Sequence, residues 1–163
     1  MSVLSEAATR TMSVDDAFER LASVDLAMVR SKLADPAEGQ GWNAADLDLY
    51  EREYRRFLAL NLMYPGASIV PCHAVDMVWH AHILDTAAYR VDCEAAFGQF
   101  FDHFPYFGLR GEKDAADLAT AYDQTLDLYV ANFGDLPDGV WTVEHTMKCK
   151  RTACKPQKCR GAQ

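Results

Sequence analysis

Apolar residues recur every three or four positions along most of the chain, the spacing that places them on one face of an α-helix. The first such stretch follows Ser13, a residue suited to capping a helix, with Asp15 and Asp16 in the expected first turn. Its apolar positions are Phe18, Leu21, Leu26, Val29 and Leu33. A proline and a glycine-rich run at residues 36–41 follow, so the pattern predicts one helix or a pair of helices ending there.

The same pattern predicts three further helices. Asn43 is a second capping residue, and the stripe that follows it predicts a helix over residues 43–62. A proline suited to a first helical turn opens the next stretch, and we expect one long helix over residues 71–97, ended by Gly98. The last predicted helix covers residues 113–132.

Other segments lack the helical spacing. Residues 99–111, QFFDHFPYFGLRG, are crowded with aromatic side chains, and we expect an ordered loop packed against the core. Residues 135–139 are a turn cluster, and residues 140–143 are expected to be briefly extended. The predicted fold is therefore all-α: a single compact bundle of four to five helices with an aromatic-rich loop and a flexible, basic, cysteine-containing C-terminal tail.

Size and composition agree with one globular domain. The chain has 163 residues, 50% of them hydrophobic, which is enough to bury a sizeable core. We expect residues 1–12 to be a flexible N-terminus, residues 13–145 to form the helical domain, and residues 146–163 to be the tail.

Charge is divided unevenly between the predicted domain and the tail. The net charge is −8, but from Lys148 onward there are six basic residues and no acidic one. Ten basic residues therefore face 24 acidic ones in residues 1–147. Binding phosphate requires basic surface on the folded part, so this pattern argues against nucleic acid as the partner of the domain. The basic tail remains a candidate for contacting an acidic partner or the acidic domain itself.

Neither end of the chain nor any internal stretch predicts a membrane segment. The first residues have no basic segment followed by an apolar run, and no apolar stretch is long enough to cross a bilayer. We therefore expect a cytoplasmic protein, in which the five cysteines would be reduced thiols. Their odd number leaves at least one unpaired in any intramolecular scheme.

The candidate chemistry lies in residues 75–86, VDMVWHAHILDT. On a helix, at about 100° per residue, His80 and His82 would point roughly 160° apart and could not share one metal ion. Asp76 and His80 are four residues apart and share a face, so they could supply two ligands to one ion.

A third ligand would come from His103 in the aromatic loop, with His73 as a weaker candidate. Two imidazoles and a carboxylate with an open position suit zinc or non-haem iron. The alternative is structural: Asp76 and His80 would form an exposed hydrogen-bonded pair, and His103 would satisfy a loop carbonyl.

His82 falls on the apolar side of the predicted helix, where a histidine usually bonds a buried backbone group or an acid. Asp85 is the nearest acid that could orient it, and these two residues are the candidates for a catalytic or proton-shuttling role. Cys93 would lie about 16 Å from His82 along an unbroken helix, which argues against a Cys-His nucleophile pair.

A second group of metal-binding residue types lies in the tail, where His145 precedes Cys149, Cys154 and Cys159. These side chains could hold Zn²⁺, and the thiols alone could hold Cu(I) or take part in redox exchange. The spacing matches no compact C-x2-C zinc site, so incidental thiols on a flexible tail are the alternative.

Two other patterns are interpreted as structural. The aromatic residues of the 99–111 loop could line a ligand site, but we expect them to seal the helix bundle, because aromatic side chains bury large areas. The charged run at residues 51–56, EREYRR, predicts a solvated helix face with weak ion pairs, or an inward turn of Arg55 or Arg56 toward Asp76 or Asp92.

Three stretches, residues 54–60 (YRRFLAL), 69–93 (IVPCHAVDMVWHAHILDTAAYRVDC) and 97–108, resemble the glycine-rich domain-containing protein-like family over roughly residues 14–133. The resemblance implies a helical domain and no particular reaction. It makes the following the motif-bearing positions: Asp76, Trp79, His80, His82, Tyr89, Asp92 and His103. Some plant members carry glycine-rich or RNA-binding regions. This chain has only 9 glycines and a Cys-Lys-rich tail, so functions of such regions do not carry over.

These observations favour a metal-binding helical domain of unknown reaction, with a metal-dependent hydrolase or oxygenase as the enzyme classes such a site supports. One alternative is a non-enzymatic interaction module in which the histidines and aromatics are structural. Another is that the tail cysteines serve metal capture or thiol redox chemistry. The partner could be a small molecule or a protein, and the sequence identifies neither.

Overall fold

A computed structural model describes residues 8–142, which form six α-helices and no β-strand. The helices are α1 (Val14–Arg20), α2 (Ala27–Ala34), α3 (Ala44–Met63), α4 (His73–Leu84), α5 (Thr86–Phe97) and α6 (Glu112–Phe133). The prediction of a compact all-α domain is therefore confirmed. The sequence left residues 14–35 open as one helix or a pair, and they form the pair α1 and α2.

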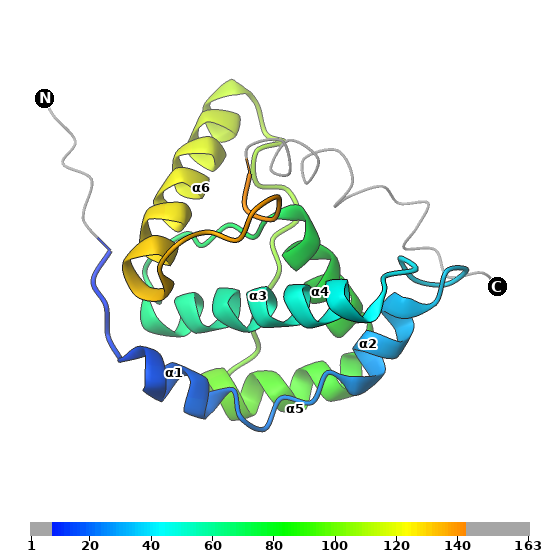
Figure 1. Ribbon diagram of the computed structural model, residues 1–163. Coiled ribbons are helices and arrows are strands. Elements are labelled where there is room, and N and C mark those ends of the chain that lie inside the picture. The colour runs from blue at the N-terminus through cyan, green and yellow to red at the C-terminus, as the bar shows by residue number, and fades with distance from the viewer. Residues whose placement is uncertain (1–7, 143–163) are drawn as a thin grey trace, which may run out of the picture.

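Helix α3 runs across the middle of the molecule (Figure 1). Helix α4 crosses behind it, and α1 and α5 lie below it in this view. Its N-cap is Asn43, whose side chain accepts a hydrogen bond from the backbone N–H of Asp46. Tyr54 and Phe57 on its inner face are wholly buried. Because α1, α2 and α4 all pack against it, α3 provides the core surface on which the other helices are arranged.

The predicted long helix over residues 71–97 is divided at Asp85 into α4 and α5. The backbone of Asp85 leaves the helical conformation (φ −81°, ψ 70°), and its side chain caps α5 by accepting from the N–H of Ala88. An aspartate can satisfy the free N–H groups at a helix start, which offsets the loss of helical continuity. The single-helix prediction was wrong for this reason, and α5 ends at Gly98 as expected.

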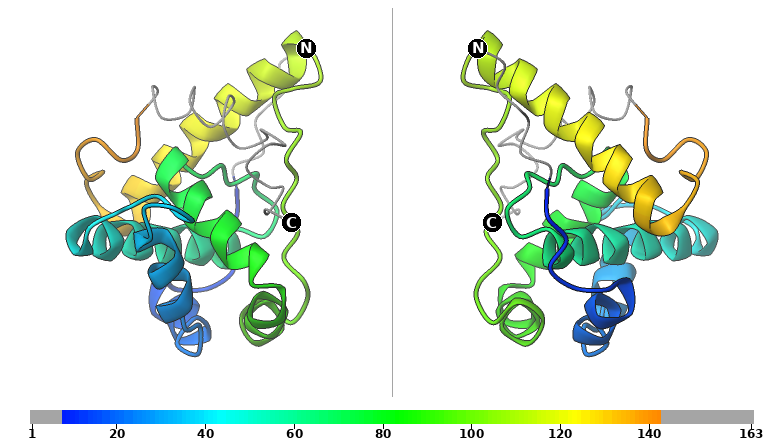
Figure 2. Two further views of the ribbon diagram at one scale, coloured as in Figure 1. Left: turned by 90° about the vertical axis from the view of Figure 1, so that its right-hand side faces the viewer. Right: turned by 90° about the vertical axis from the view of Figure 1, so that its left-hand side faces the viewer.

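The chain between α5 and α6 runs along one side of the molecule, from the end of α5 to the far end of α6 (Figure 2). The other end of α6 is tied to the remainder of the fold by side chains. Thr125 Oγ1 accepts from the backbone N–H of Val70, and Asn132 donates to the hydroxyl of Tyr64. The loop and α6 thus form a separate wall beside the α3–α4 layer.

The expectation of a solvated face at residues 51–56 was wrong for Glu53, which is fully buried. Its carboxylate accepts hydrogen bonds from Arg56, Tyr129 and Trp141. Val140 does not begin an extended segment either, because it lies in a turn in which its N–H donates to the carbonyl of Pro137.

Within residues 8–142, no helix has both the length and the apolar character needed to cross a membrane. The predictions for the tail, including His145 and the cysteines 149, 154 and 159, lie outside the described residues.

Candidate metal centre

The residues of the candidate centre come first from α4, where Asp76 and His80 are one helical turn apart on the same face. The Asp76 side chain is 5% exposed and that of His80 is 22% exposed. Nε2 of His80 lies 3.6 Å from Oδ1 of Asp76. The predicted i,i+4 pair is therefore present, but it is largely buried rather than on the surface.

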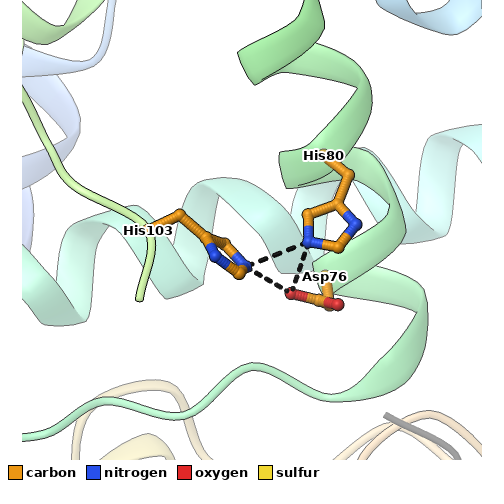
Figure 3. Close-up of side chains that lie close together, drawn as sticks. All are labelled: Asp76, His80 and His103. Carbon is orange, nitrogen blue, oxygen red and sulfur yellow. Dashed lines mark hydrogen bonds and ion pairs between the residues drawn. The ribbon is translucent and has the colours of Figure 1, made fainter. Parts of the chain in front are cut away.

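His103 comes from the loop after α5 and faces both residues of α4 (Figure 3). Its Nε2 lies 3.0 Å from Nε2 of His80 and 3.2 Å from Oδ1 of Asp76. The ring also packs against Trp79, with 4.4 Å between ring centroids. The three residues that the sequence suggested as one set are thus brought together.

The spacing of these three donor atoms fits a single metal ion. At metal–ligand distances of about 2.0–2.1 Å, tetrahedral ligands lie roughly 3.4 Å apart and neighbouring octahedral ligands about 3 Å apart. The observed separations of 3.0, 3.2 and 3.6 Å cover that interval. The three residues also form the one group of metal-binding side chains found within residues 8–142.

Asp76 carries a further sign of an incomplete site. Its second carboxylate oxygen, Oδ2, is buried and is the only such side-chain nitrogen or oxygen within residues 8–142 that has no hydrogen-bond partner. A buried carboxylate normally has its oxygens satisfied by donors or a cation, because desolvating a charge is costly. Oδ1 faces two imidazole nitrogens, and only a protonated nitrogen or a cation can satisfy it.

The environment of His80 favours the neutral ring that a metal requires. Burial lowers its pKa from the ordinary value of 6.5, and the neighbouring His103 acts in the same direction. The Asp76 carboxylate opposes this shift but does not reverse it. At neutral pH, the His80 ring therefore has one unprotonated nitrogen, which coordination requires.

The loop that carries His103 is fixed to the helices by a buried chain of hydrogen bonds. The indole N–H of Trp79 donates to the hydroxyl of Tyr89 over 2.9 Å, and that hydroxyl donates to the carbonyl of Phe101. Phe101 stacks on Trp79 at an interplanar angle of 17°. These contacts hold the backbone two residues before His103, so α4 and α5 together set the position of the third donor.

The far end of the loop is fastened to the start of α6. Asp114 accepts from the backbone N–H groups of Gly108 and Arg110 and from the Arg110 guanidinium. The guanidinium is the main reason that the pKa of the Asp114 carboxyl falls to about 2. Gly108 has φ 86°, and a Cβ there would lie 2.5 Å from Leu118, so this turn requires glycine.

The His82 side chain lies in a different environment from the three donors. This agrees with the expectation that His80 and His82 point to opposite sides of the helix. Nδ1 lies 2.9 Å from the hydroxyl of Tyr54, and Nε2 lies 2.8 Å from the Asp92 carboxylate. The acid that holds His82 is therefore Asp92 and not Asp85, which caps α5 instead. Since the chain turns at Asp85, residues of α5 fold back onto His82.

His73 and the described cysteines are also placed apart from the donor cluster. His73 is the first residue of α4 and contributes no atom to the cluster. Cys72 and Cys93 are buried free thiols, and burial raises the pKa of Cys72 to about 12. Because of the turn at Asp85, Cys93 and His82 both line one small pocket, although they lie on different helices.

The loop aromatics seal the bundle only in part. Phe101 and Phe107 pack against the core, but Phe100, Phe104 and Tyr106 are 52%, 55% and 58% exposed. The expectation that all of them form a plug was therefore wrong for these three.

Sequence reasoning also missed Tyr54 and Asp114. For Asp114 the sequence did contain a signal. An aspartate in the first turn of a helix, after a turn with glycines, often accepts hydrogen bonds from nearby backbone N–H groups.

Residues 26–125 match the model of a family described as UCP032817-like, a span that contains all three donor residues. No curated protein and no solved structure matches the chain.

Proposed function

The chain belongs to the UCP032817-like family, and we propose that the domain binds one divalent metal ion through Asp76, His80 and His103. The family description names no reaction, so the proposal depends on the site. The observation that carries it is the convergence of three donor atoms within 4.8 Å of one another. The unpartnered Oδ2 of Asp76 supports it, because a buried carboxylate oxygen without a hydrogen-bond donor would gain from a nearby cation.

The donor set favours zinc or iron(II). Two imidazoles and one carboxylate leave further coordination positions for water or substrate, as catalytic sites require. Zinc in this setting lowers the pKa of bound water and supports hydrolysis, whereas iron(II) supports oxygenase chemistry. We therefore propose a metal-dependent hydrolase or oxygenase as the activity of the domain.

Within this proposal the protein residues have separate tasks. Asp76 and His80 would hold the ion from the rigid face of α4, and His103 would close the coordination from the loop. His82 has both ring nitrogens engaged by Tyr54 and Asp92, and we assign it to holding α5 rather than to moving protons.

Metal uptake by the full-length, untagged protein tests the proposal. We expect titration calorimetry and elemental analysis to give one Zn²⁺ or Fe²⁺ per chain under reducing, anaerobic conditions. His103→Gln should weaken binding at least tenfold, because one of three protein ligands is lost. His73→Gln is the matched control and should leave the affinity unchanged.

The tail requires its own control because its cysteines are also potential ligands. A full-length variant with serine at positions 149, 154 and 159 should keep the metal if the helical domain holds it. Loss of all binding in that variant, with His103→Gln unaffected, would assign the metal to the tail and contradict the proposal.

The second candidate function is a non-enzymatic interaction module in which the triad clamps the loop. The packing of His103 on Trp79 and its contact with His80 favour this alternative. The two functions differ in chelator sensitivity. EDTA should lower the melting temperature of a metal-loaded domain, whereas a purely structural clamp should melt at the same temperature with or without chelator.

We further propose that the UCP032817-like domain corresponds to the helical part of glycine-rich domain-containing protein-like proteins, on the sequence motifs quoted above.

Recruitment of an acidic partner by the basic tail is a separate proposal. Removal of the six tail charges should abolish such binding while leaving metal uptake intact.

A further inference from the structure

A cleft of about 450 Å³ lies beside the proposed metal centre, and Asp76 and His103 form part of its wall. Clefts of this size bury most of the surface of a small organic ligand. His80 is not among the residues that line it. A metal ion held by the three donors would therefore sit at the edge of the cleft, with the cleft on the side of Asp76 and His103.

The rest of the wall is mainly apolar and rich in flat side chains. Its apolar residues include Ile69, Pro71, Trp79, Phe104, Phe107 and Leu118. Trp79 is held in one orientation by its hydrogen bond to Tyr89 and its stacking on Phe101. Rigid aromatic and aliphatic walls favour a flat, apolar ligand over a sugar or a nucleotide, which would need more polar partners.

The mouth of the cleft has apolar side chains that face solvent. Phe104 is 55% exposed and Leu109 is 51% exposed, although both lie on a loop fastened at each end. An ordered loop that exposes large apolar residues beside a cleft is typical of a binding site whose ligand covers them.

The charges around the cleft identify the end at which an anionic group would bind. Arg110, the one arginine or lysine in its wall, is engaged by Asp114 at 2.7 Å and packs over the Phe104 ring. Asp102 also lines the wall, and its negative charge disfavours an anionic group there in the absence of a cation. A divalent ion bound by one carboxylate and two neutral imidazoles would retain a net positive charge. The metal edge is therefore the place for an oxygen donor with negative charge.

We propose that the cleft binds a small molecule with a flat, aromatic-sized apolar body and an anionic oxygen donor that reaches the metal. This inference rests on the metal centre proposed above and names the class of ligand that the centre would act on. Phe104 provides the exposed rim of the cleft, and Trp79 provides its buried wall.

Hydroxamates of different body size test the proposal on zinc-loaded, full-length protein. Acetohydroxamate carries the oxygen donors alone, and 2-naphthohydroxamate adds a flat apolar body. We expect calorimetry to give at least tenfold tighter binding of the naphthyl compound, with the zinc content unchanged after titration. Phe104→Ala should reduce that preference at least threefold, because it removes apolar surface from the rim.

Phe100→Ala is the matched control, since Phe100 lies in the same loop, is 52% exposed and does not line the cleft. It should leave the preference intact. Equal affinities for the two hydroxamates in a protein that binds zinc would overturn the cleft assignment and leave the metal proposal standing. Failure to take up zinc at the triad would overturn both, because the oxygen donor would have no metal to bind.

Discussion

At the scale of single residues, Asp76 determines how the candidate centre behaves. Its side chain is 5% exposed, and one of its oxygens has no partner. A buried carboxylate oxygen without a partner lowers the free energy of unfolding, and a bound cation would remove that cost. A substitution at Asp76 therefore distinguishes a metal-binding site from a purely structural cluster.

Asp76→Asn should abolish metal uptake and leave the metal-free protein as stable as the wild type, or more stable by up to about 1 kcal/mol. The neutral amide avoids the cost of burying a charge, although it cannot replace the carboxylate as a ligand. Urea unfolding at pH 8, above the ordinary histidine pKa, provides the measurement. A loss of stability of several kcal/mol without metal would instead identify Asp76 as an anchor of the fold.

Individual donors could be predicted from the sequence, but their surroundings could not. The pairing of Asp76 with His80 follows from four-residue spacing, which any helix would produce. The position of His103 depended on where a loop without periodicity folds, and only the structure supplies that. The unpartnered Oδ2 depends on the packing of several distant segments, so no local pattern predicts it.

At the scale of elements, the division between α4 and α5 brings the loop to the site. Because α5 turns back at Asp85, Tyr89 can reach both the Trp79 indole and the Phe101 carbonyl. Helical periodicity continues through residues 75–93, so the apolar pattern alone predicted one helix. An aspartate can cap a new helix or lie within an old one, and spacing does not distinguish the two.

Tyr89→Phe should loosen the loop and weaken metal binding about tenfold, with a loss of about 1–2 kcal/mol in the free energy of unfolding. The change removes one hydroxyl that makes two hydrogen bonds, one buried and one partly buried. Metal titration and urea unfolding would measure both effects. Tyr106→Phe is the control, because Tyr106 lies in the same loop and is 58% exposed. Equal effects of the two changes would contradict the role given to Tyr89.

His82 should make the stability of the domain depend on pH. Burial lowers its pKa below the ordinary value of 6.5, although the Asp92 carboxylate acts in the opposite direction. The unfolded chain therefore takes up this proton at a higher pH than the folded protein does. Stability from the neutral ring should be complete above about pH 7 and should decline as the pH falls through 6.5.

Melting temperatures of the metal-free protein between pH 5 and 8 would measure this decline. His82→Gln should have a lower melting temperature at pH 8 but a smaller fall between pH 7 and pH 5. His80 also has a lowered pKa, so part of the slope should remain in that variant. An unchanged slope in His82→Gln would show that His82 does not contribute to the pH dependence.

At the scale of the whole molecule, Glu53 joins segments that are far apart in the sequence. Oε2 accepts from the hydroxyl of Tyr129 on α6 at 2.6 Å and from the indole of Trp141 at 2.9 Å. Oε1 accepts from Arg56 on the same helix. The sequence placed Glu53 in a solvated charged run, because the partners that allow its burial are more than 70 residues away.

Glu53→Gln should therefore lower the free energy of unfolding by about 3 kcal/mol, since it breaks a buried ionic network without removing its partners. The amide would also set an N–H₂ group against the N–H or O–H donors on one side of the network. Asp117→Asn is the control: Asp117 is 51% exposed and pairs with Lys113, so its loss should change stability by less than about 1 kcal/mol. Because α6 forms the wall that supports the loop at Asp114, the Glu53 variant should also bind metal more weakly. If Glu53→Gln unfolds at the same urea concentration as the wild type, α6 does not depend on this network, and the site is supported by α3, α4 and α5 alone.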